Sequence, residues 1–458
     1  MSRITRNNDY IGRLRRPTGK FYHSPAVELD SGVQNSLRES RATPAGTENP
    51  SADDGEAALY QVTENTHESL EDRLLTAADD LLTAIDTELP ESLHVQVTEW
   101  CELHGFDTPT TTETRQTLAR QAVLNLVLKT TLYEWHHQHG NLPPLPTNTR
   151  EGLRQAAEHT DETAFNEYVL DEIVWLADDD TLAPIVDARD WLLETRHPSK
   201  ALGRLYASLL SNDDRQLLGQ FRTPLYIGTL MRTWAATGGE SVLDPGMGTG
   251  ILSSPFHPQR EHTTDPGHVA GIDRSRLSHL MGTTVLRLYG QAHESHATDL
   301  LDLSPDDLQQ DVDAIVCNPP YTSGDSLPTT YKSQINTQIE DSTGLTISAR
   351  SPLYAYFIYH ARQFLSPGDR AAFITPQSFL SAVYGDKLKQ FLLDRFSLKA
   401  LVQFNPEGQS VFSDADTTAL IMFLEATSAN DSGGETRFIR VDESVSVVEL
   451  RNAVENTD

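Results

Sequence analysis

The spacing of hydrophobic residues divides the chain into regions of different texture. Residues 1–60 have few apolar positions and no apolar period, and Ser, Asn, Gly, Pro and acidic residues predominate. Such a segment buries too little apolar surface to offset the entropy of folding, so a disordered N-terminal arm is predicted. Over residues 61–210 apolar positions recur at helical spacing and predict an all-helical domain. The clearest series are Leu70, Leu74, Leu75, Ala78, Leu81 and Leu82, and then Leu118, Ala122, Leu126 and Leu128.

Over residues 211–428 short β-rich runs alternate with helical stretches. The runs fall at 241–243, 269–272, 312–317, 371–375, 400–404 and 418–424. One helical face carries Leu353, Tyr356, Phe357, His360, Ala361 and Phe364, and another carries Leu388, Phe391 and Leu392. The alternation predicts an α/β domain with a doubly wound, mostly parallel sheet, whose ligands bind beyond the carboxyl ends of the strands. Residues 429–458 are polar and acidic and are predicted to be a tail.

The charge of the chain indicates the conditions in which it works. Among 458 residues the formal net charge is −30. Acidic surfaces with few lysines suit a halophilic protein, because about 1 M salt shortens the Debye length to roughly 3 Å and screens self-repulsion. The same salt removes counterion release as a driving force, so the negative charge does not exclude a nucleic-acid partner. The lysines are Lys20, Lys129, Lys200, Lys332, Lys387, Lys389 and Lys399.

Several classes of protein are disfavoured. No apolar run approaches the length of a membrane span, and the basic N-terminus is not followed by the apolar stretch of a signal peptide. The only cysteines, Cys101 and Cys317, lie far apart, so neither a disulfide framework nor a zinc cluster is expected. We therefore expect a cytoplasmic protein without a membrane partner and without a metal.

A glycine-rich loop follows the first β-rich run. Residues 244–250 read Asp-Pro-Gly-Met-Gly-Thr-Gly, and Ile251 stands where a dinucleotide fingerprint needs its third glycine. An acid at the strand end suits a cofactor with a positive amino group better than one with a pyrophosphate, which points to S-adenosylmethionine. Asp273 follows the next strand, about where an acid would bind ribose hydroxyls, and Asp299 is another acid after a plausible third strand. Singly, each acid could instead be a helix N-cap.

A second loop carries the candidate catalytic residues. The run at 312–317 leads directly into Asn318, Pro319, Pro320 and Tyr321. The prolines stiffen the loop and lack amide hydrogens, so the Asn318 side-chain oxygen and the Pro319 carbonyl can accept hydrogen bonds from one amine. Two such acceptors would make a planar, conjugated amine nucleophilic, and Tyr321 offers a flat face for a base. Neither a metal nor a covalent nucleophile is required.

These motifs resemble the Asn-Pro-Pro-Tyr amino-methyltransferases, in particular the gamma-type N6-adenine DNA methyltransferases of restriction–modification systems. Residues 221–224 read Phe-Arg-Thr-Pro, similar to that family's Phe-x-Thr-Pro element before the cofactor loop. Residues 373–380 resemble its segment after strand five. Residues 411–412, followed by 417–421, resemble its late motif, whose aromatic ring stacks on a flipped adenine. The resemblance covers about residues 201–428, with the motifs in the family's order.

The resemblance implies a fold, a cofactor and site residues. It implies a Rossmann-like, seven-stranded sheet and methyl transfer from S-adenosylmethionine to adenine in double-stranded DNA after base flipping. Asn318, Pro319, Pro320 and Tyr321 would be catalytic, and Phe412 would bind the target base. The residues implied to bind the cofactor are Phe221, Thr223, Pro224, Asp244, Gly246, Gly248, Gly250, Asp273 and Asp299.

Two departures from the family pattern leave alternatives open. Gly246 stands where the family more often has Ala. This glycine only gives the backbone more freedom. The family's separate target-recognition domain has no counterpart after the late motif, so we expect a separate specificity or restriction subunit, or readout by the insert at 322–350 with the helical domain. The amine could also belong to RNA adenine or to a protein glutamine. The chain could alternatively be a catalytically silent DNA-binding or partner subunit.

Overall fold

The computed structural model describes residues 4–5, 70–86, 89–104, 106, 111–210, 223–236, 239–254, 267–404, 419–428, 435–441 and 447–455. Of the predicted arm at 1–60, only Ile4–Thr5 is therefore described, as strand β1. The candidate residues Phe221 and Phe412 lie outside the described residues. In the part of the chain that is described, no helix is both long and apolar enough to cross a membrane.

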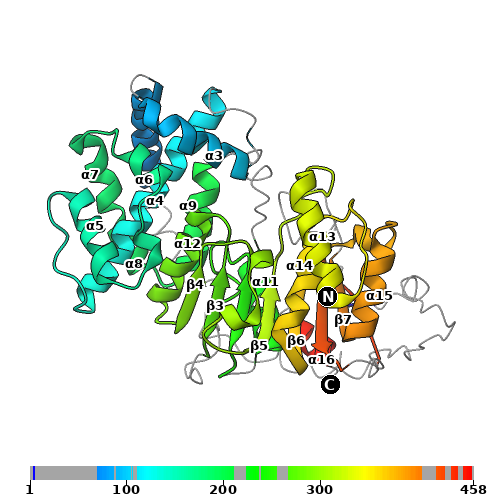
Figure 1. The fold of residues 1–458 in the computed structure, drawn as a ribbon. Coiled ribbons are helices and arrows are strands. Elements are labelled where there is room, and N and C mark those ends of the chain that lie inside the picture. The colour runs from blue at the N-terminus through cyan, green and yellow to red at the C-terminus, as the bar shows by residue number, and fades with distance from the viewer. Residues whose placement is uncertain are drawn as a thin grey trace, which may run out of the picture.

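A single mixed sheet organises the second half of the chain (Figure 1). Its strand order is β1-β9-β7-β8-β6-β5-β2-β3-β4. The run from β4 to β6 is parallel, and β8 lies antiparallel between β6 and β7. The predicted doubly wound, mostly parallel α/β fold is confirmed. The remaining strands are β2(Val242–Pro245), β3(Val269–Ile272), β4(His293–His296), β5(Val312–Cys317), β6(Leu365–Pro376), β7(Phe396–Phe404), β8(Ala419–Ala426) and β9(Arg437–Val441).

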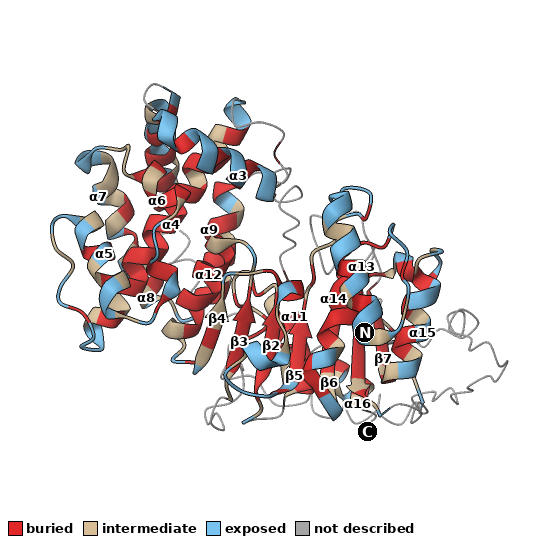
Figure 2. Ribbon diagram, viewed as in Figure 1, coloured by how far each residue is buried: buried red, intermediate tan, exposed pale blue. Residues whose placement is uncertain are grey.

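Helices cover both faces of this sheet, which explains why its strands are continuous apolar runs. Leu243, Ile315 and Phe373 pack with the helices of one face, whereas their sequence neighbours Val242 and Val316 pack on the other. Figure 2 shows the central strands buried and the outer sides of the helices exposed. One face carries α13(Thr329–Thr343), α14(Leu353–Ala361) and α15(Gly385–Arg395), and the other carries α11(Leu225–Ala235) and α16(Val447–Glu455).

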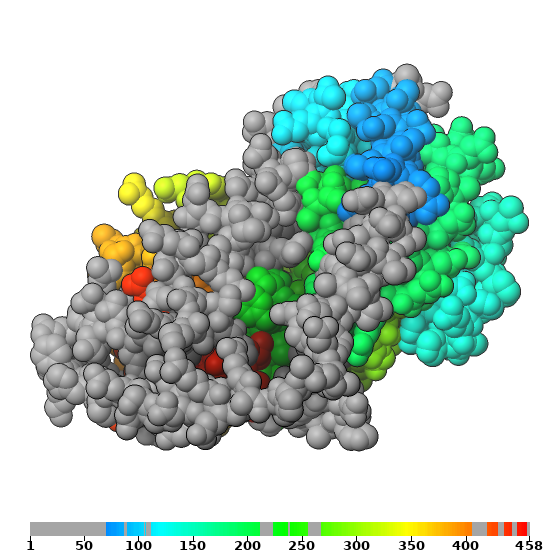
Figure 3. Space-filling view, turned by 180° about the vertical axis from the view of Figure 1, so that it is seen from behind, coloured from blue at the N-terminus to red at the C-terminus, as the bar shows by residue number. Residues whose placement is uncertain are grey.

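The first half of the chain is helical, as predicted. Residues 70–86 are helical, and α4, which Thr111 caps, is buried on nearly every side by the other helices. Seen from behind, this helical unit and the part of the chain after residue 320 lie on opposite sides of the molecule (Figure 3). Its helices are α3(His94–His104), α4(Thr112–Gln138), α5(Thr149–His159), α6(Val169–Val174), α7(Asp179–Asp187), α8(Arg189–Glu194) and α9(Pro198–Leu209).

The helical unit and the sheet share a core through one helix. Helix α12(Arg276–Leu288) follows β3, yet its Leu277, Leu280 and Met281 belong to the hydrophobic cluster of the helical unit. Short 3₁₀ helices complete the described elements: η2(Glu91–Leu93), η3(Thr163–Phe165), η4(Leu300–Asp302), η5(Pro305–Asp307), η6(Arg362–Phe364) and η7(Gln377–Leu380).

The segment predicted as an acidic tail contributes structure to the sheet. Strand β9 pairs in parallel with β7 and antiparallel with β1, so two strands extend the seven that the resemblance implies. Leu450 and Val454 of α16 are buried beside α11. Acidic residues between these few apolar positions dominate the average composition and hide their helical spacing.

An ion pair is buried inside the helical unit. Lys129 Nζ lies 2.8 Å from Asp171 Oδ2, and the two side chains are 1% and 2% exposed. Lys129 also donates to the carbonyls of Phe165 and Asn166. Asp171 in turn accepts from Asn125 Nδ2. Each charge in this pair is therefore surrounded by hydrogen-bonding partners.

Candidate active site

The glycine loop after β2 has the backbone that its sequence predicts. Gly246, Gly248 and Gly250 have φ values of 91°, 51° and 66°. Residues with a Cβ rarely adopt backbone conformations in this region. The Gly248 amide donates to Asp273 Oδ2 at 3.1 Å. The loop therefore turns tightly over the carboxyl ends of β2 and β3.

Close packing holds this loop against α12. A Cβ on Gly271 would lie 2.4 Å from Met247 Sδ, and one on Gly282 would lie 2.5 Å from the same atom. Met247 is itself buried. The thioether of Met247 therefore occupies space that a side chain at either glycine would need. This packing fixes the distance between the loop and the helix.

Asp244 is a carboxyl group without a matching donor. Its side chain is fully buried, and no described residue donates to either oxygen with hydrogen-bond geometry, although Ser253 lies near enough to lower the pKa. Burial, with a smaller contribution from the charge of Asp273, raises the pKa of Asp244 to about 7. Burying an ionisable carboxyl group costs free energy, so positive charge near this position would favour its ionised form.

Asp273 stands at the end of the neighbouring strand, as predicted. Besides the Gly248 amide, it accepts a hydrogen bond from the Ser275 amide at 2.9 Å. Burial is the largest cause that raises the pKa of Asp273 to about 6, and the charge of Asp299 contributes. Two carboxyl groups with raised pKa values thus flank one glycine loop.

Asp299 is held by a residue that the sequence did not single out. It follows β4 by three residues, after a strand as expected, and it also caps η4, which is the alternative that the sequence left open. Its Oδ2 accepts from the hydroxyl of Tyr331 in α13 at 2.6 Å. The guanidinium of Arg274 lies over the Tyr331 ring, 5.8 Å from its centre. The insert after the Asn-Pro-Pro-Tyr loop therefore contacts Asp299.

The Asn-Pro-Pro-Tyr loop, which carries the candidate catalytic residues, touches the glycine loop. Strands β2 and β5 are parallel neighbours, so Asp244 and Asn318 leave the sheet at the same edge. Cys317 lies in β5 and donates to the Pro245 carbonyl at 3.0 Å. A Cβ on Gly246 would lie 3.8 Å from the Asn318 carbonyl oxygen. The two predicted constellations form one site.

The upstream motif joins the same site. Asn318 Nδ2 donates to Thr223 Oγ1 at 3.1 Å, although the two residues are 95 positions apart. Pro224 directly follows Thr223 and occupies the position just before α11. The hydrogen bond from the amide nitrogen fixes which way the amide is turned, and so fixes the direction of its oxygen.

Tyr321 completes the loop after Pro319 and Pro320. Its ring meets that of Tyr354 edge to face, with 6.2 Å between centres. The hydroxyls of Tyr354 and Tyr384 lie 2.7 Å apart. Burial raises the pKa of Tyr321 well above its usual value, so the phenol stays neutral.

The structure thus brings the described candidate residues to one edge of the sheet. Phe221 and Phe412 are outside the described residues. Sequence reasoning missed Tyr331 and Arg274, because an aromatic residue within an insert carries no motif. Among the residues with described positions, no group of three His, Cys, Asp or Glu could hold a metal ion. The geometry suits a ligand with positive charge and hydroxyls, placed next to an oriented amide.

Comparison with known proteins identifies relatives. Residues 272–412 match the model of the Eco57I restriction-modification methylase family. The Type II methyltransferase M.AccI of Acinetobacter calcoaceticus is 26% identical over 236 residues, which cover 51% of this chain and 41% of that protein. M.XamI of Xanthomonas campestris pv. amaranthicola is 27% identical over 222 residues, with 46% and 40% covered. The matches thus span about two fifths of these relatives' length.

Solved structures share the fold. The methyltransferase subunit of a type I restriction-modification system from Streptococcus thermophilus superimposes with a TM-score of 0.50 at 16% identity, covering 86% of this chain and 94% of that one. DrdV, solved with DNA, gives 0.53 at 16% identity, with 86% and 44% covered. The resemblance to the methyltransferases of restriction–modification systems is confirmed: part of the chain matches a family model of these enzymes, and the chain shares the fold of the type I methyltransferase subunit.

Proposed function

We propose that the chain transfers a methyl group from S-adenosylmethionine to the N6 amine of adenine in DNA, within a restriction–modification or defence system. The observation that carries this proposal is the hydrogen bond between Asn318 and Thr223. It joins two distant motifs beside the glycine loop, in the order in which the amino-methyltransferases carry them. Base flipping would bring the amine to this edge of the sheet.

The acids and the glycine loop form the proposed cofactor site. The cofactor supplies a methyl group made electrophilic by its sulfonium. Asp244 would balance the positive charge of the cofactor or accept hydrogen bonds from its positive groups. Asp273 would accept hydrogen bonds from the ribose hydroxyls. Asp299 would bind the cofactor at the far end of the site. The other proposed contacts are Phe221, Thr223, Pro224, Gly246, Gly248 and Gly250.

The catalytic loop would activate the target amine. Asn318 Oδ1 and the Pro319 carbonyl accept its two hydrogens, which draws the nitrogen lone pair out of conjugation and toward the methyl group. Pro320 keeps the loop rigid, and Tyr321, with Phe412, would stack on the base. No proton has to be removed before transfer, and the positioning of the two reactants supplies much of the rate.

Double-stranded DNA is the proposed partner, and a separate specificity or restriction subunit is a further proposal. Two experiments separate the alternatives. Calorimetry with S-adenosylmethionine tests for a silent subunit, because a chain without cofactor affinity cannot transfer methyl groups. Transfer of a tritiated methyl group is then compared among duplex DNA, RNA and a glutamine-containing protein. Labelling of DNA alone supports the proposal, and labelling of RNA or protein alone contradicts it.

We also propose that the protein works at high salt. The net charge of −30 makes self-repulsion strong when salt is scarce. The melting temperature should therefore rise steeply as potassium chloride increases from about 0.1 M to about 2 M, over which the Debye length falls from about 10 Å to below 3 Å. A melting temperature that does not change with salt would remove the halophilic interpretation and leave the enzyme proposal standing.

A further inference from the structure

Residues 322–404 differ in charge from the rest of this acidic chain. They contain eight Lys or Arg residues against six Asp or Glu, a net charge of +2 within a chain of net charge −30. Burial alone would remove charges of both signs. Cations, however, are as frequent here, with eight in 83 residues, as in the whole chain, with 36 in 458. The selective loss of acids indicates a surface that faces a negatively charged partner.

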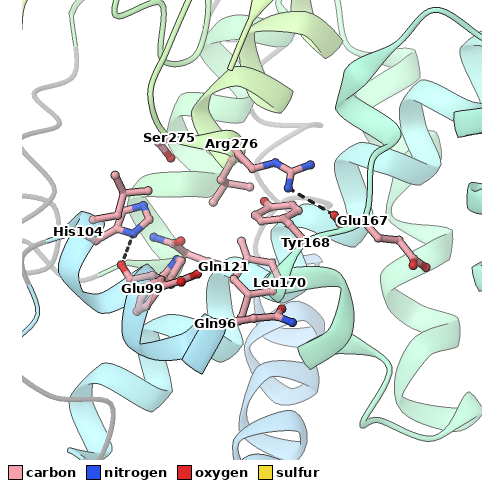
Figure 4. Close-up of a pocket in the computed structure, with 13 residues that line it drawn as sticks. Gln96, Glu99, His104, Gln121, Glu167, Tyr168, Leu170, Ser275 and Arg276 are labelled. Atoms are coloured by element: carbon pink, nitrogen blue, oxygen red, sulfur yellow. Dashed lines mark hydrogen bonds between the residues drawn. The ribbon is translucent and has the colours of Figure 1, made fainter. Parts of the chain in front are cut away.

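The helical unit has the opposite balance of charge. Residues 70–210 contain ten Lys or Arg against 25 Asp or Glu. The exposed Glu99 and Glu167 line the cavity at Trp100, which has a volume of about 390 Å³ and lies among α3, α4, α6 and α12 (Figure 4). A polyanion would therefore meet repulsion at the helical unit. Of the two regions, the segment that follows the Asn-Pro-Pro-Tyr loop suits such a partner better.

The insert at 322–350 places two cations beside the Asn-Pro-Pro-Tyr loop. The Gly324 carbonyl accepts a hydrogen bond from Lys332 Nζ at 2.9 Å. A Cβ on Gly324 would lie 2.6 Å from the carbonyl oxygen of Arg350, so the two ends of the insert meet there. The Arg350 side chain is exposed. Because Gly324 follows Tyr321 by only three residues, both cations lie close to the loop that carries the candidate catalytic residues.

A third cation reaches the same edge of the sheet from α15. Strand β6 runs parallel to β5, so η7 and the start of α15 follow β6 at the edge where Asn318 lies. Lys387 is exposed in the first turn of α15. Just before this turn, the hydroxyl of Tyr384 lies 2.7 Å from that of Tyr354, whose ring contacts Tyr321. The start of α15 is thus linked to the Asn-Pro-Pro-Tyr loop.

The acids of the segment leave this edge positive. Asp386 pairs with Lys389 at 2.9 Å, so its charge is balanced. Asp325 is exposed beside Gly324, where Lys332 and Arg350 outnumber it. The remaining acids lie toward the other end of α13, in the first half of β6 and at the end of α15: Glu340, Asp341, Asp369 and Asp394.

We propose that Lys332, Arg350 and Lys387 contact the phosphate backbone of the duplex on either side of the flipped adenine. The proposal rests on the proposed function, because a base held at Asn318 keeps its duplex against this edge. Arginine can bind phosphate oxygens with two parallel hydrogen bonds, and lysine binds them as a point charge. Such contacts fix the position of the DNA and carry no sequence information, so choice of the site still requires another surface.

Charge reversal in the full chain tests this surface. Arg350→Glu combined with Lys387→Glu should raise the KM for duplex DNA at least about tenfold in about 0.5 M potassium chloride. The kcat at saturating DNA and the dissociation constant for S-adenosylmethionine should stay within about twofold, because neither residue is assigned to the amine or the cofactor. Arg154→Glu is the matched control at an exposed cation in α5, and it should leave the KM within about twofold.

Neutral substitutions separate phosphate contacts from general repulsion. The pair Arg350→Gln and Lys387→Gln is compared with wild type by fluorescence anisotropy on labelled duplexes of two unrelated sequences. Binding should weaken equally for both sequences. The slope of log affinity against log salt should become shallower by about two, because each lost phosphate contact contributes about 0.9. This pair also replaces the Glu pair if the Glu pair melts early.

Three results would overturn the assignment. An unchanged KM in the charge-reversed pair would place the duplex elsewhere, and an equal rise in Arg154→Glu would mean that only the total charge matters. An unchanged KM with a lower molar mass by light scattering would assign the face to an acidic protein or a second copy of this chain. If wild type neither binds nor methylates DNA, the proposed function fails as well. An unchanged KM in an active wild-type background rejects the surface alone.

Discussion

The helical unit and the edge of the sheet both bury charged side chains, but the two regions differ in the hydrogen-bonding partners that these side chains have. In the helical unit, Lys129 and Asp171 face each other at 2.8 Å with further hydrogen bonds around both. At the sheet edge, Asp244 is fully buried and no described residue donates to it with hydrogen-bond geometry. A buried ion pair whose hydrogen bonds are all made within the chain needs no ligand to complete it. A buried carboxyl group without a paired cation lowers stability, and such a group is expected near a site where a ligand brings positive charge.

The largest expected effect on stability comes from breaking the bonded pair. Lys129→Met leaves Asp171 buried without its cation and should lower the unfolding free energy by about 3–5 kcal/mol. Lys399→Met is the control, because Lys399 pairs with Glu425 where both side chains are about one third exposed. It should cost less than about 1 kcal/mol. Denaturant unfolding in high salt measures both. Equal losses would mean that burial does not distinguish the two pairs.

Asn318→Ala should show the opposite behaviour, with intact folding and lost activity. Removing the acceptor proposed for the target amine should lower kcat by about 10²–10³-fold, as removal of an oriented donor or acceptor does in other enzymes. The dissociation constant for S-adenosylmethionine should change less than about threefold, because the residue is assigned to the amine. Thr223→Val, which removes the acceptor for Asn318 Nδ2, should give a smaller loss. A variant that kept most of its turnover would refute the catalytic assignment.

Asp244→Ala should weaken cofactor binding by about 1.5–3 kcal/mol, the contribution of a hydrogen bond to a charged group. The apo protein should be no less stable than wild type near pH 8, because the change removes a buried charge without a donor. Asp386→Ala, at a 76% exposed side chain, is the control for both measurements. Unchanged calorimetric affinity in Asp244→Ala would mean that the glycine loop binds another ligand.

The pH dependence sharpens the comparison further. A carboxyl whose pKa is raised on folding favours the folded state at low pH, and that contribution is lost as pH rises through the folded value, about 7 for Asp244 and about 6 for Asp273. A cationic cofactor prefers the ionised carboxylates. Its affinity should therefore rise between about pH 5 and pH 8, by at most about tenfold per unit for each carboxyl. Asp244→Asn should flatten the curve, and an affinity that falls with pH would contradict the assignment.

Some features could be predicted from the sequence because the backbone itself dictates them. Glycines at φ values such as 91° for Gly246 and a stiff proline loop after β5 leave local signals. Strands buried on both faces leave apolar runs. Strand β4, which reads His-Glu-Ser-His, has only β3 as a neighbour among the described strands and gives no such run.

Long-range contacts could not be predicted in this way. The bond from Tyr331 to Asp299 depends on how the insert folds back, and the cavity at Trp100 is assembled from separate helices. Strand β9 and α16 were missed because acidic residues surround their few apolar positions. The roles of Phe221 and Phe412 stay predictions, since both lie outside the described residues.

The atom that receives the methyl group tests the central claim most directly. Duplex DNA is incubated in high salt with the chain and with S-adenosylmethionine that carries a deuterated methyl group. The DNA is then digested to nucleosides for mass spectrometry. The account predicts N6-methyl-2′-deoxyadenosine with the full isotopic shift, and about 10²–10³-fold less of it in the same time with Asn318→Ala. Label on a cytosine instead, or equal label from the variant, would contradict it.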